Sequence, residues 1–279
     1  MTGHHRLEGR VAAITGGSGI LGRAMAQTLA EVGVRLALLA RTPEKGEAVA
    51  RDLAALGAEV IYVPCDVLDA ASVRAARDVV FTRWGRCDIL INAAGGNHPR
   101  ATTGDEVWSP EAAIGPTFFD LVSEEFFDIV GSNLLGTVIA SQVFAEHMAG
   151  QHPPGVIVNI SSMSASRPMT RVPAYSAAKA GVENFTRWLA VYLAKVGIRV
   201  NALAPGFFLT EQNRTLLLDE RGQWTQRAQR ILDHTPMGRL GQPSDLSGTL
   251  LWMIDEEYSG FVTGVTVPVD GGFSAYAGV

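Results

Sequence analysis

Tyr175 and Lys179, within the run Pro-Ala-Tyr-Ser-Ala-Ala-Lys, are two side chains whose types and spacing could support proton transfer. They lie four residues apart in residues 174–195, where apolar side chains recur at helical spacing, so both are expected on one face of a helix. A phenol ordinarily loses its proton near pH ~10, and a neighbouring ammonium favours the phenolate. The pair could therefore act as a general acid or base, although the same spacing also fits an exposed lysine beside a half-buried tyrosine.

Seven short β-branched runs alternate along the chain with longer segments of helical spacing. The runs cover residues 11–15, 34–40, 59–63, 88–92, 156–160, 198–203 and 265–269. This alternation predicts an α/β fold with a single Rossmann-type, doubly wound, seven-stranded parallel sheet and helices on both faces. The 279 residues, 47% of them hydrophobic, suffice for the core of such a sheet, and we expect one domain over residues 1–279.

Two stretches interrupt the alternation, residues 95–120 and 205–236. Each follows a predicted strand, and open α/β sheets bind their ligands outside the carboxyl ends of the strands. Long loops at that edge are typical of substrate-binding elements, and the second stretch contains a predicted helix.

Composition argues against several kinds of partner. The formal net charge is −5 without a basic block, which argues against nucleic acid. No apolar run approaches the ~18 residues that span a bilayer, and the first residues lack the apolar centre of a signal peptide. We therefore expect no membrane partner and a cytoplasmic protein. Cys65 and Cys87 are isolated in the sequence, which predicts reduced, buried thiols and no metal site.

The first predicted strand runs into Thr-Gly-Gly-Ser-Gly-Ile-Leu-Gly, residues 15–22, which precedes a helical segment. Glycines let a turn come close to a pyrophosphate, whose charge is favoured by the free N–H groups at the start of a helix. This position predicts a dinucleotide site, although a flexible turn has the same composition and the spacing is not Gly-x-Gly-x-x-Gly. The predicted contacts are Gly16, Ser18, Gly19, Ile20, Leu21 and Gly22.

Further motifs follow in a fixed order along the chain. They are Asn-Ala-Ala-Gly at 92–95, Asn133, the pair Ser161 and Ser162, Tyr175-x-x-x-Lys179, and Pro205 with Gly206. With the glycine turn, this set covers nearly the whole chain and resembles the short-chain dehydrogenase/reductase family. One glycine of the family's Thr-Gly-x-x-x-Gly-x-Gly is displaced, because Gly19 precedes Ile20 where that pattern has its glycine.

The resemblance implies an enzyme that moves a hydride between a nicotinamide dinucleotide and a carbonyl or alcohol carbon. Tyr175 would be the general acid in reduction and the base in oxidation, and Lys179 would lower its pKa and hold the nicotinamide ribose. Ser162 would donate a hydrogen bond to the substrate oxygen, and Asn133 would hold a water that resupplies protons. Considered without the family, Ser162 also fits a turn after a strand, and Asn133 fits a polar group inside a helix.

Cofactor selectivity is predicted from the end of the second strand. An acidic residue there would bind the ribose hydroxyls of NAD(H), but the chain has Ala40 followed by Arg41. A guanidinium can pair with a 2′-phosphate, so NADP(H) is favoured and NAD(H) stays possible, unless Arg41 is only a surface residue. The resemblance also implies cofactor contacts from Asp66, Val67, Asn92, Ala93, Ala94, Gly95, Tyr175, Lys179, Pro205, Gly206 and Thr210.

Within the family, four segments resemble the D-mannonate oxidoreductases, which interconvert D-fructuronate and D-mannonate. These segments are residues 95–99, 118–120, 205–214 and 270–276. Such a sugar acid needs polar side chains and a cation for its carboxylate. Arg171 is the predicted carboxylate partner because it lies just before Tyr175, whereas His98 could instead cap a turn. The candidate substrate residues are Asn97, His98, Arg171, Phe207, Gln212 and Asn213.

Two other functions fit the same motifs. One is a reductase of another polyol, a keto-gluconate or a 3-oxoacyl substrate, and the other is a dinucleotide-binding protein without chemistry. The intact catalytic set argues against the second. The segments 125–147 and 174–195 carry apolar residues on more than one side, which predicts a homodimer or homotetramer, with residues 273–279 buried against a neighbour.

Overall fold

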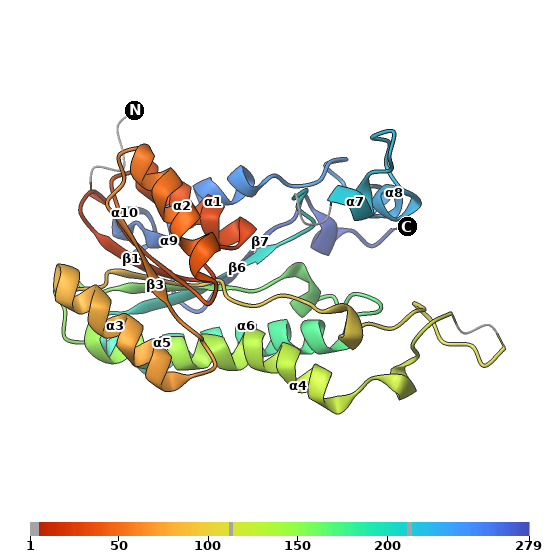
Figure 1. Ribbon diagram of the computed structural model, residues 1–279, viewed down its shortest axis with the longest axis horizontal. Coiled ribbons are helices and arrows are strands. Elements are labelled where there is room, and N and C mark those ends of the chain that lie inside the picture. The colour runs from red at the N-terminus through yellow and green to blue at the C-terminus, as the bar shows by residue number, and fades with distance from the viewer. Residues whose placement is uncertain (1–5, 112–113, 211–213, 279) are drawn as a thin grey trace.

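Figure 1 shows the protein as a computed structural model, which describes residues 6–111, 114–210 and 214–278. Its centre is a seven-stranded parallel sheet in the order β3-β2-β1-β4-β5-β6-β7. The strands are β1 Val11–Thr15, β2 Arg35–Ala40, β3 Val60–Pro64, β4 Ile89–Asn92, β5 Val156–Ile160, β6 Arg199–Pro205 and β7 Thr266–Val269. All seven predicted strands are confirmed, with small shifts at their ends.

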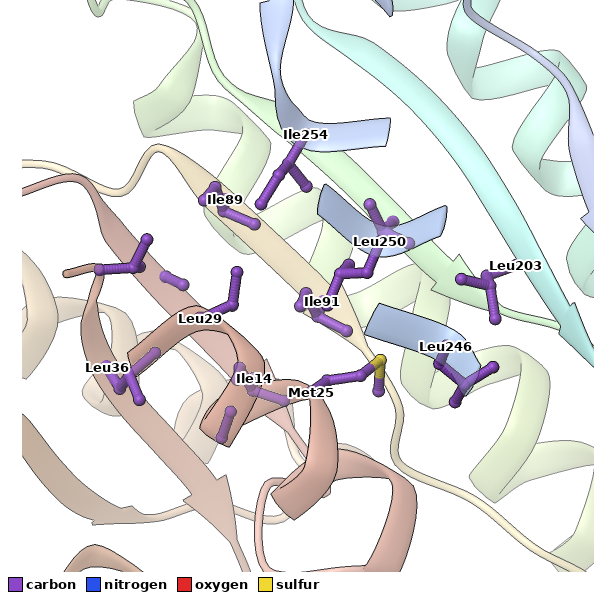
Figure 2. Close-up of a cluster of buried hydrophobic side chains, with 14 of the residues drawn as sticks. Ile14, Met25, Leu29, Leu36, Ile89, Ile91, Leu203, Leu246, Leu250 and Ile254 are labelled. Atoms are coloured by element: carbon purple, nitrogen blue, oxygen red, sulfur yellow. The ribbon is translucent and has the colours of Figure 1, made fainter. Parts of the chain in front are cut away.

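Helices cover both faces of the sheet, as the doubly wound prediction requires (Figure 1). One face packs against α1 Ile20–Glu31, α2 Pro43–Ala55 and α9 Ser247–Ile254, and the other against α3 Ala70–Trp84, α5 Gly136–Met148 and α6 Pro173–Leu193. Figure 2 shows the first of these cores, where Ile14 and Ile91 of the sheet share a cluster with Met25, Leu29 and Leu250 of the helices. Burial on both faces accounts for the continuous apolar runs of the central strands.

The helix before β5 contains a π turn that the sequence pattern does not reveal. α4 Ser123–Val130 continues through the π turn Gly131–Leu135 into α5. Together they form the one helical run, within the described residues, that is long and apolar enough to cross a membrane. Phe144 and Met148 on this run are fully buried against the sheet, so the run packs as a core helix of the α/β fold.

The two interrupting stretches lie at one end of the molecule, beyond the carboxyl ends of the strands (Figure 1). Within residues 95–120 the structure has two short 3-10 turns, Pro99–Ala101 and Phe118–Asp120. Residues 205–236 hold α7 Arg214–Leu217 and α8 Gln226–Asp233, where the sequence predicts one helix. The remaining short elements are α10 Glu256–Ser259 and 3-10 turns at Met163–Ala165, Ala194–Val196, Pro243–Leu246 and Phe273–Ala275.

The strand order reverses at β1, which lies between β2 and β4. Thr15 at the end of β1 pairs in register with Asn92 at the end of β4. The Thr15 hydroxyl accepts hydrogen bonds from the backbone N–H groups of Ala93, at 3.1 Å, and Ala94, at 3.2 Å. The turns after β1 and β4 are thus joined at the point where open α/β sheets bind ligands.

Candidate active site

Tyr175 and Lys179 lie on one face of α6, as predicted. The Lys179 Nζ atom is 5.6 Å from the centroid of the Tyr175 ring. Lys179 is buried, and its ammonium donates a hydrogen bond of 2.7 Å to the carbonyl oxygen of Ile160 at the end of β5. Pro173 at the first turn of α6 suits a helix start, because its missing N–H needs no partner there. The end of β5 and the start of α6 together fix the relative position of the phenol and the ammonium.

Burial shifts the pKa values of both groups. It raises the pKa of Tyr175 above its ordinary 10.0, and a hydrogen bond with Ser162 acts in the opposite direction. It lowers the pKa of Lys179 from 10.5 to about 8. The sequence predicts instead that the lysine lowers the phenol pKa; that prediction is wrong for this structure, because desolvation of the phenolate dominates. Tyr175 therefore keeps its proton at neutral pH, which is the form required of a general acid.

Ser162 and Ser161 follow β5 but face different partners. The Ser162 hydroxyl oxygen accepts hydrogen bonds of 3.2 Å from both the backbone N–H and the hydroxyl of Ser164, and it is hydrogen-bonded with Tyr175. Ser161 instead donates to the buried carboxylate of Glu183 at 3.1 Å. Of the two adjacent serines, the predicted one faces the phenol, so the structure brings Ser162, Tyr175 and Lys179 together.

Asn133 is buried in the π turn and holds the segment after β4. Its Nδ2 donates to the carbonyl oxygens of Gly96, at 2.7 Å, and Ile129, at 2.8 Å, and its Oδ1 accepts from the Gly96 N–H at 3.1 Å. Gly95 has φ +132°, and a side chain there would collide with the Asn133 amide. The Asn133 side chain thus positions the Gly95-Gly96 turn, and its part in proton resupply stays a prediction.

The glycine turn after β1 brings its backbone close to the segment after β4 and to the start of α1. Gly16 has φ +66°, and a Cβ on it would lie 2.8 Å from the carbonyl oxygen of Ala93, so only glycine fits there. Gly19 is the N-cap of α1, without a side-chain cap and with no acidic side chain in the first turn. The first turn of this helix thus carries no carboxylate of its own to compete for the N–H groups at Ile20 and Leu21, which suits a bound phosphate.

The other predicted cofactor residues lie around this turn. Arg41 is exposed directly after β2. Asp66 accepts a hydrogen bond of 3.0 Å from the Leu68 N–H, and Val67 is largely buried. Asn92 is different, because its buried side chain donates to Ser141, at 2.9 Å, and to Asn159, at 2.8 Å. A cofactor contact of Asn92 would therefore come from its backbone. Pro205 is the last residue of β6, and Gly206 and Thr210 lie in the segment that follows it.

Arg171 links the loop at 95–120 to the start of α6. Its Nε donates to the Thr103 carbonyl oxygen at 2.9 Å, and its own carbonyl oxygen accepts from the Thr103 N–H at 2.9 Å. Arg171 has φ +72°, the one non-glycine residue in the left-handed region within the described chain. Such backbone strain persists only where the surroundings fix it, and it is common at functional sites.

The remaining candidate substrate residues have different contacts in the structure. His98 accepts a hydrogen bond of 3.3 Å from the Arg100 N–H and caps the turn Pro99–Ala101, as the alternative interpretation predicts. Asn97 donates to the Thr102 hydroxyl at 3.2 Å. Phe207 packs edge-to-face on Phe273, with 5.4 Å between ring centroids. The predicted residues Gln212 and Asn213 lie outside the described part of the chain.

Two features of the site have no signal in the sequence. Thr15 joins the turns after β1 and β4 although it is far from Ala93 along the chain. Arg230 on α8 forms an ion pair with Glu106, with 3.4 Å between Nη1 and Oε1, so the two interrupting stretches are in contact. Neither pair shares a spacing motif, and only the folded topology brings them together.

Known proteins resemble the chain over its whole length. Residues 16–274 match the family model of enoyl-(acyl carrier protein) reductase. An uncharacterized oxidoreductase of Bacillus subtilis, UxuB, is 52% identical over 276 residues, which are 99% of each chain. The chain belongs to the short-chain dehydrogenase/reductase family. The predicted family and the predicted fold are both confirmed.

Two further members of the short-chain dehydrogenase/reductase family are informative. The 2-dehydro-3-deoxy-D-gluconate 5-dehydrogenase of Escherichia coli is 34% identical over 269 residues, which are 96% of this chain and 97% of that one. A Haemophilus influenzae protein provisionally named D-mannonate oxidoreductase has a crystal structure with bound NAD. It shares 46% identity and a TM-score of 0.93 over 98% of each chain. The present chain is therefore an oxidoreductase that uses a nicotinamide dinucleotide.

Proposed function

We propose that this protein interconverts the carbonyl and secondary-alcohol forms of a sugar acid, D-fructuronate and D-mannonate. The observation that carries the proposal is the cluster of Ser162, Tyr175 and Lys179, with Arg171 held by Thr103 four residues before Tyr175. The names of two relatives, a D-mannonate oxidoreductase and a 2-dehydro-3-deoxy-D-gluconate 5-dehydrogenase, support a sugar-acid substrate.

Proton transfer in this reaction falls to Tyr175. When bound, the nicotinamide dinucleotide supplies or accepts the hydride. In reduction, the Tyr175 hydroxyl donates its proton to the carbonyl oxygen, and the raised pKa keeps this proton in place beforehand. Ser162 orients the same oxygen through a hydrogen bond. Lys179, with a pKa of about 8, can exchange a proton close to neutral pH and so restore the phenol. Alcohol oxidation runs through the reverse transfers.

We propose Arg171 as a partner of the substrate carboxylate. Its Nε is engaged by Thr103, so the terminal Nη atoms would make the contact. Arg171→Ala should raise KM for D-fructuronate about 10-fold or more, because a charge-assisted hydrogen bond is lost. The KM for D-fructose, which has a hydroxymethyl group in place of the carboxylate, should change far less. Arg167→Ala, on the same loop and exposed, is the matched control. If Arg171→Ala raised KM equally for both substrates, Arg171 would not be the partner of the carboxylate.

For the cofactor, we propose that the enzyme accepts NAD(H) and favours NADP(H). The bound NAD in the Haemophilus influenzae structure supports the first part, and the exposed Arg41 after β2 supports the second. Arg41→Gln should lower the ratio of kcat/KM with NADPH to kcat/KM with NADH about 10-fold, because the 2′-phosphate loses its cation. Steady-state kinetics with both cofactors measure the ratio. An unchanged ratio would show that Arg41 is only a surface residue.

We also propose a homodimer or homotetramer in the cytoplasm. Trp188, Val191 and Tyr192 on α6 are largely exposed, and the rings of Trp188 and Tyr192 stack at 5.0 Å. An apolar helix face of this kind suits a neighbouring copy. Light scattering should give the mass of two or four chains, and a monomer would refute the proposal. Cys65 and Cys87 are free and buried, in keeping with a reducing compartment.

Assays with D-fructuronate, keto-gluconates and a 3-oxoacyl thioester, each with NADH and NADPH, test the proposed function. D-fructuronate should give the highest kcat/KM. Phe207 and Phe208 after β6 line a cavity of about 360 Å³ together with Met237, so the thioester is the alternative substrate that this assay has to exclude. Preference for the thioester would favour the acyl reductase. Cofactor binding without turnover of any substrate would favour the non-catalytic alternative.

A further inference from the structure

The short segment from Thr103 to Glu106 lies between two arginines that come from different parts of the chain. Arg171, before α6, exchanges two hydrogen bonds of 2.9 Å with Thr103. Arg230, on α8, pairs with the Glu106 carboxylate at 3.4 Å. Because Thr103 and Glu106 are three residues apart, they lie within about 10 Å of each other. The two guanidinium groups are therefore attached to one short piece of the loop.

This segment connects the two loops at the end of the molecule where the site lies. Figure 1 shows α8 and the loop at 95–120 at the same end, beyond the carboxyl ends of the strands. The Glu106–Arg230 pair spans from one loop to the other, and Arg171 ties the same segment to the helix that carries Tyr175. The segment at residues 103–106 thus contacts both α8 and the residues that precede α6.

Arg230 can release the Glu106 carboxylate and bind a different carboxylate in its place. The two side chains are 55% and 61% exposed, and exposed pairs of this kind contribute little to stability. A second carboxylate can therefore displace Glu106 from Arg230 at small cost. Arg230 already binds a carboxylate in the structure, that of Glu106, at the place where the two loops are in contact.

We propose that Arg230 is a specificity-determining residue whose carboxylate partner changes from Glu106 to the substrate. This inference rests on the proposed sugar-acid function. The acid carboxylate replaces Glu106 on Arg230 and is held between Arg230 and Arg171. A neutral sugar has no group that can displace Glu106, so the enzyme discriminates against it.

The test is a double-mutant cycle with Glu106→Gln, Arg230→Gln and the double variant, assayed with D-fructuronate and D-fructose. Glu106→Gln should lower KM for the acid about 2- to 5-fold, because the internal competitor is removed. Arg230→Gln should raise it about 10-fold, through loss of a charge-assisted contact. The double variant should resemble Arg230→Gln, since Glu106 competes only where Arg230 is present. Arg227→Gln, an exposed arginine on the same helix, is the matched control and should behave as wild type.

The expected result is that the two single variants change KM for D-fructuronate in opposite directions. Neither variant should change KM for D-fructose. If both variants shift KM for acid and neutral sugar in the same direction and to the same extent, the pair is only a structural contact. The inference about Arg230 then fails, while the proposed sugar-acid function stands. If the wild type shows no preference for sugar acids, the proposed function fails and the inference fails with it. Melting temperatures equal to that of the wild type show that each exposed substitution leaves the fold intact.

Discussion

Tyr175→Phe should lower kcat for ketone reduction about 10³-fold, because the transition state loses its proton donor. The substitution removes one oxygen and keeps the ring that packs in the cluster with Ala101, Ile129 and Ala174. The phenol is the only group of this cluster that can donate a proton, and burial holds that proton at neutral pH. The expected loss therefore falls on kcat, with dissociation constants for the dinucleotide within about 3-fold of wild type.

Single-turnover kinetics and nicotinamide fluorescence titration separate the two effects. Tyr258→Phe is the matched control, since this tyrosine is half exposed on α10 at the opposite end of the molecule (Figure 1). It should leave both kcat and cofactor binding unchanged. A Tyr175→Phe enzyme that retains more than about a tenth of the wild-type kcat would show that another group transfers the proton.

Lys179→Met should lower kcat/KM about 10²-fold and also change how stability depends on pH. In the wild type, burial lowers the pKa of Lys179 from 10.5 to about 8. Between these values the unfolded chain binds more protons than the native one, so this lysine makes stability rise with pH. Below a pH of about 8, the buried ammonium carries its full desolvation cost. A methionine has neither effect.

Denaturant unfolding of both proteins at about pH 7.5 and about pH 9.5 measures this difference. Across that range the wild type should gain about 2 kcal/mol relative to Lys179→Met, the equivalent of ~1.5 pKa units. Lys195→Met, an exposed lysine just beyond α6, serves as the control and should show no such change. An identical pH dependence for Lys179→Met and the wild type would mean that Lys179 keeps an ordinary pKa in the native protein.

The sequence predicts the architecture well because its signals are local. Strands such as β1 and β5 are short apolar runs bounded by turns, and the structure reproduces both without a shift. The shared face of Tyr175 and Lys179 follows from four-residue helical spacing, and the 5.6 Å separation confirms it. The family resemblance assigns the catalytic role to Ser162 and not to Ser161, and the distinct partners of the two serines agree with that assignment.

What the sequence does not predict depends on the burial of groups and on contacts between distant segments. The rise in the Tyr175 pKa comes from desolvation, which composition and spacing do not measure. The π turn around Asn133 needs one extra residue per turn, which the apolar pattern does not mark. The contacts of Arg171 with Thr103 and of Arg230 with Glu106 join loops that are far apart in the sequence.

The central claim is that a proton-donating tyrosine acts on the carbonyl of a sugar acid. Its most direct test is the kcat/KM of the wild-type enzyme for D-fructuronate relative to D-fructose, with D-mannonate identified as the product. The kcat/KM for D-fructose should be about 10-fold to 100-fold lower than that for D-fructuronate, because the neutral sugar lacks the carboxylate contact. Equal kcat/KM values for the two sugars, or no D-mannonate from D-fructuronate, would contradict the account.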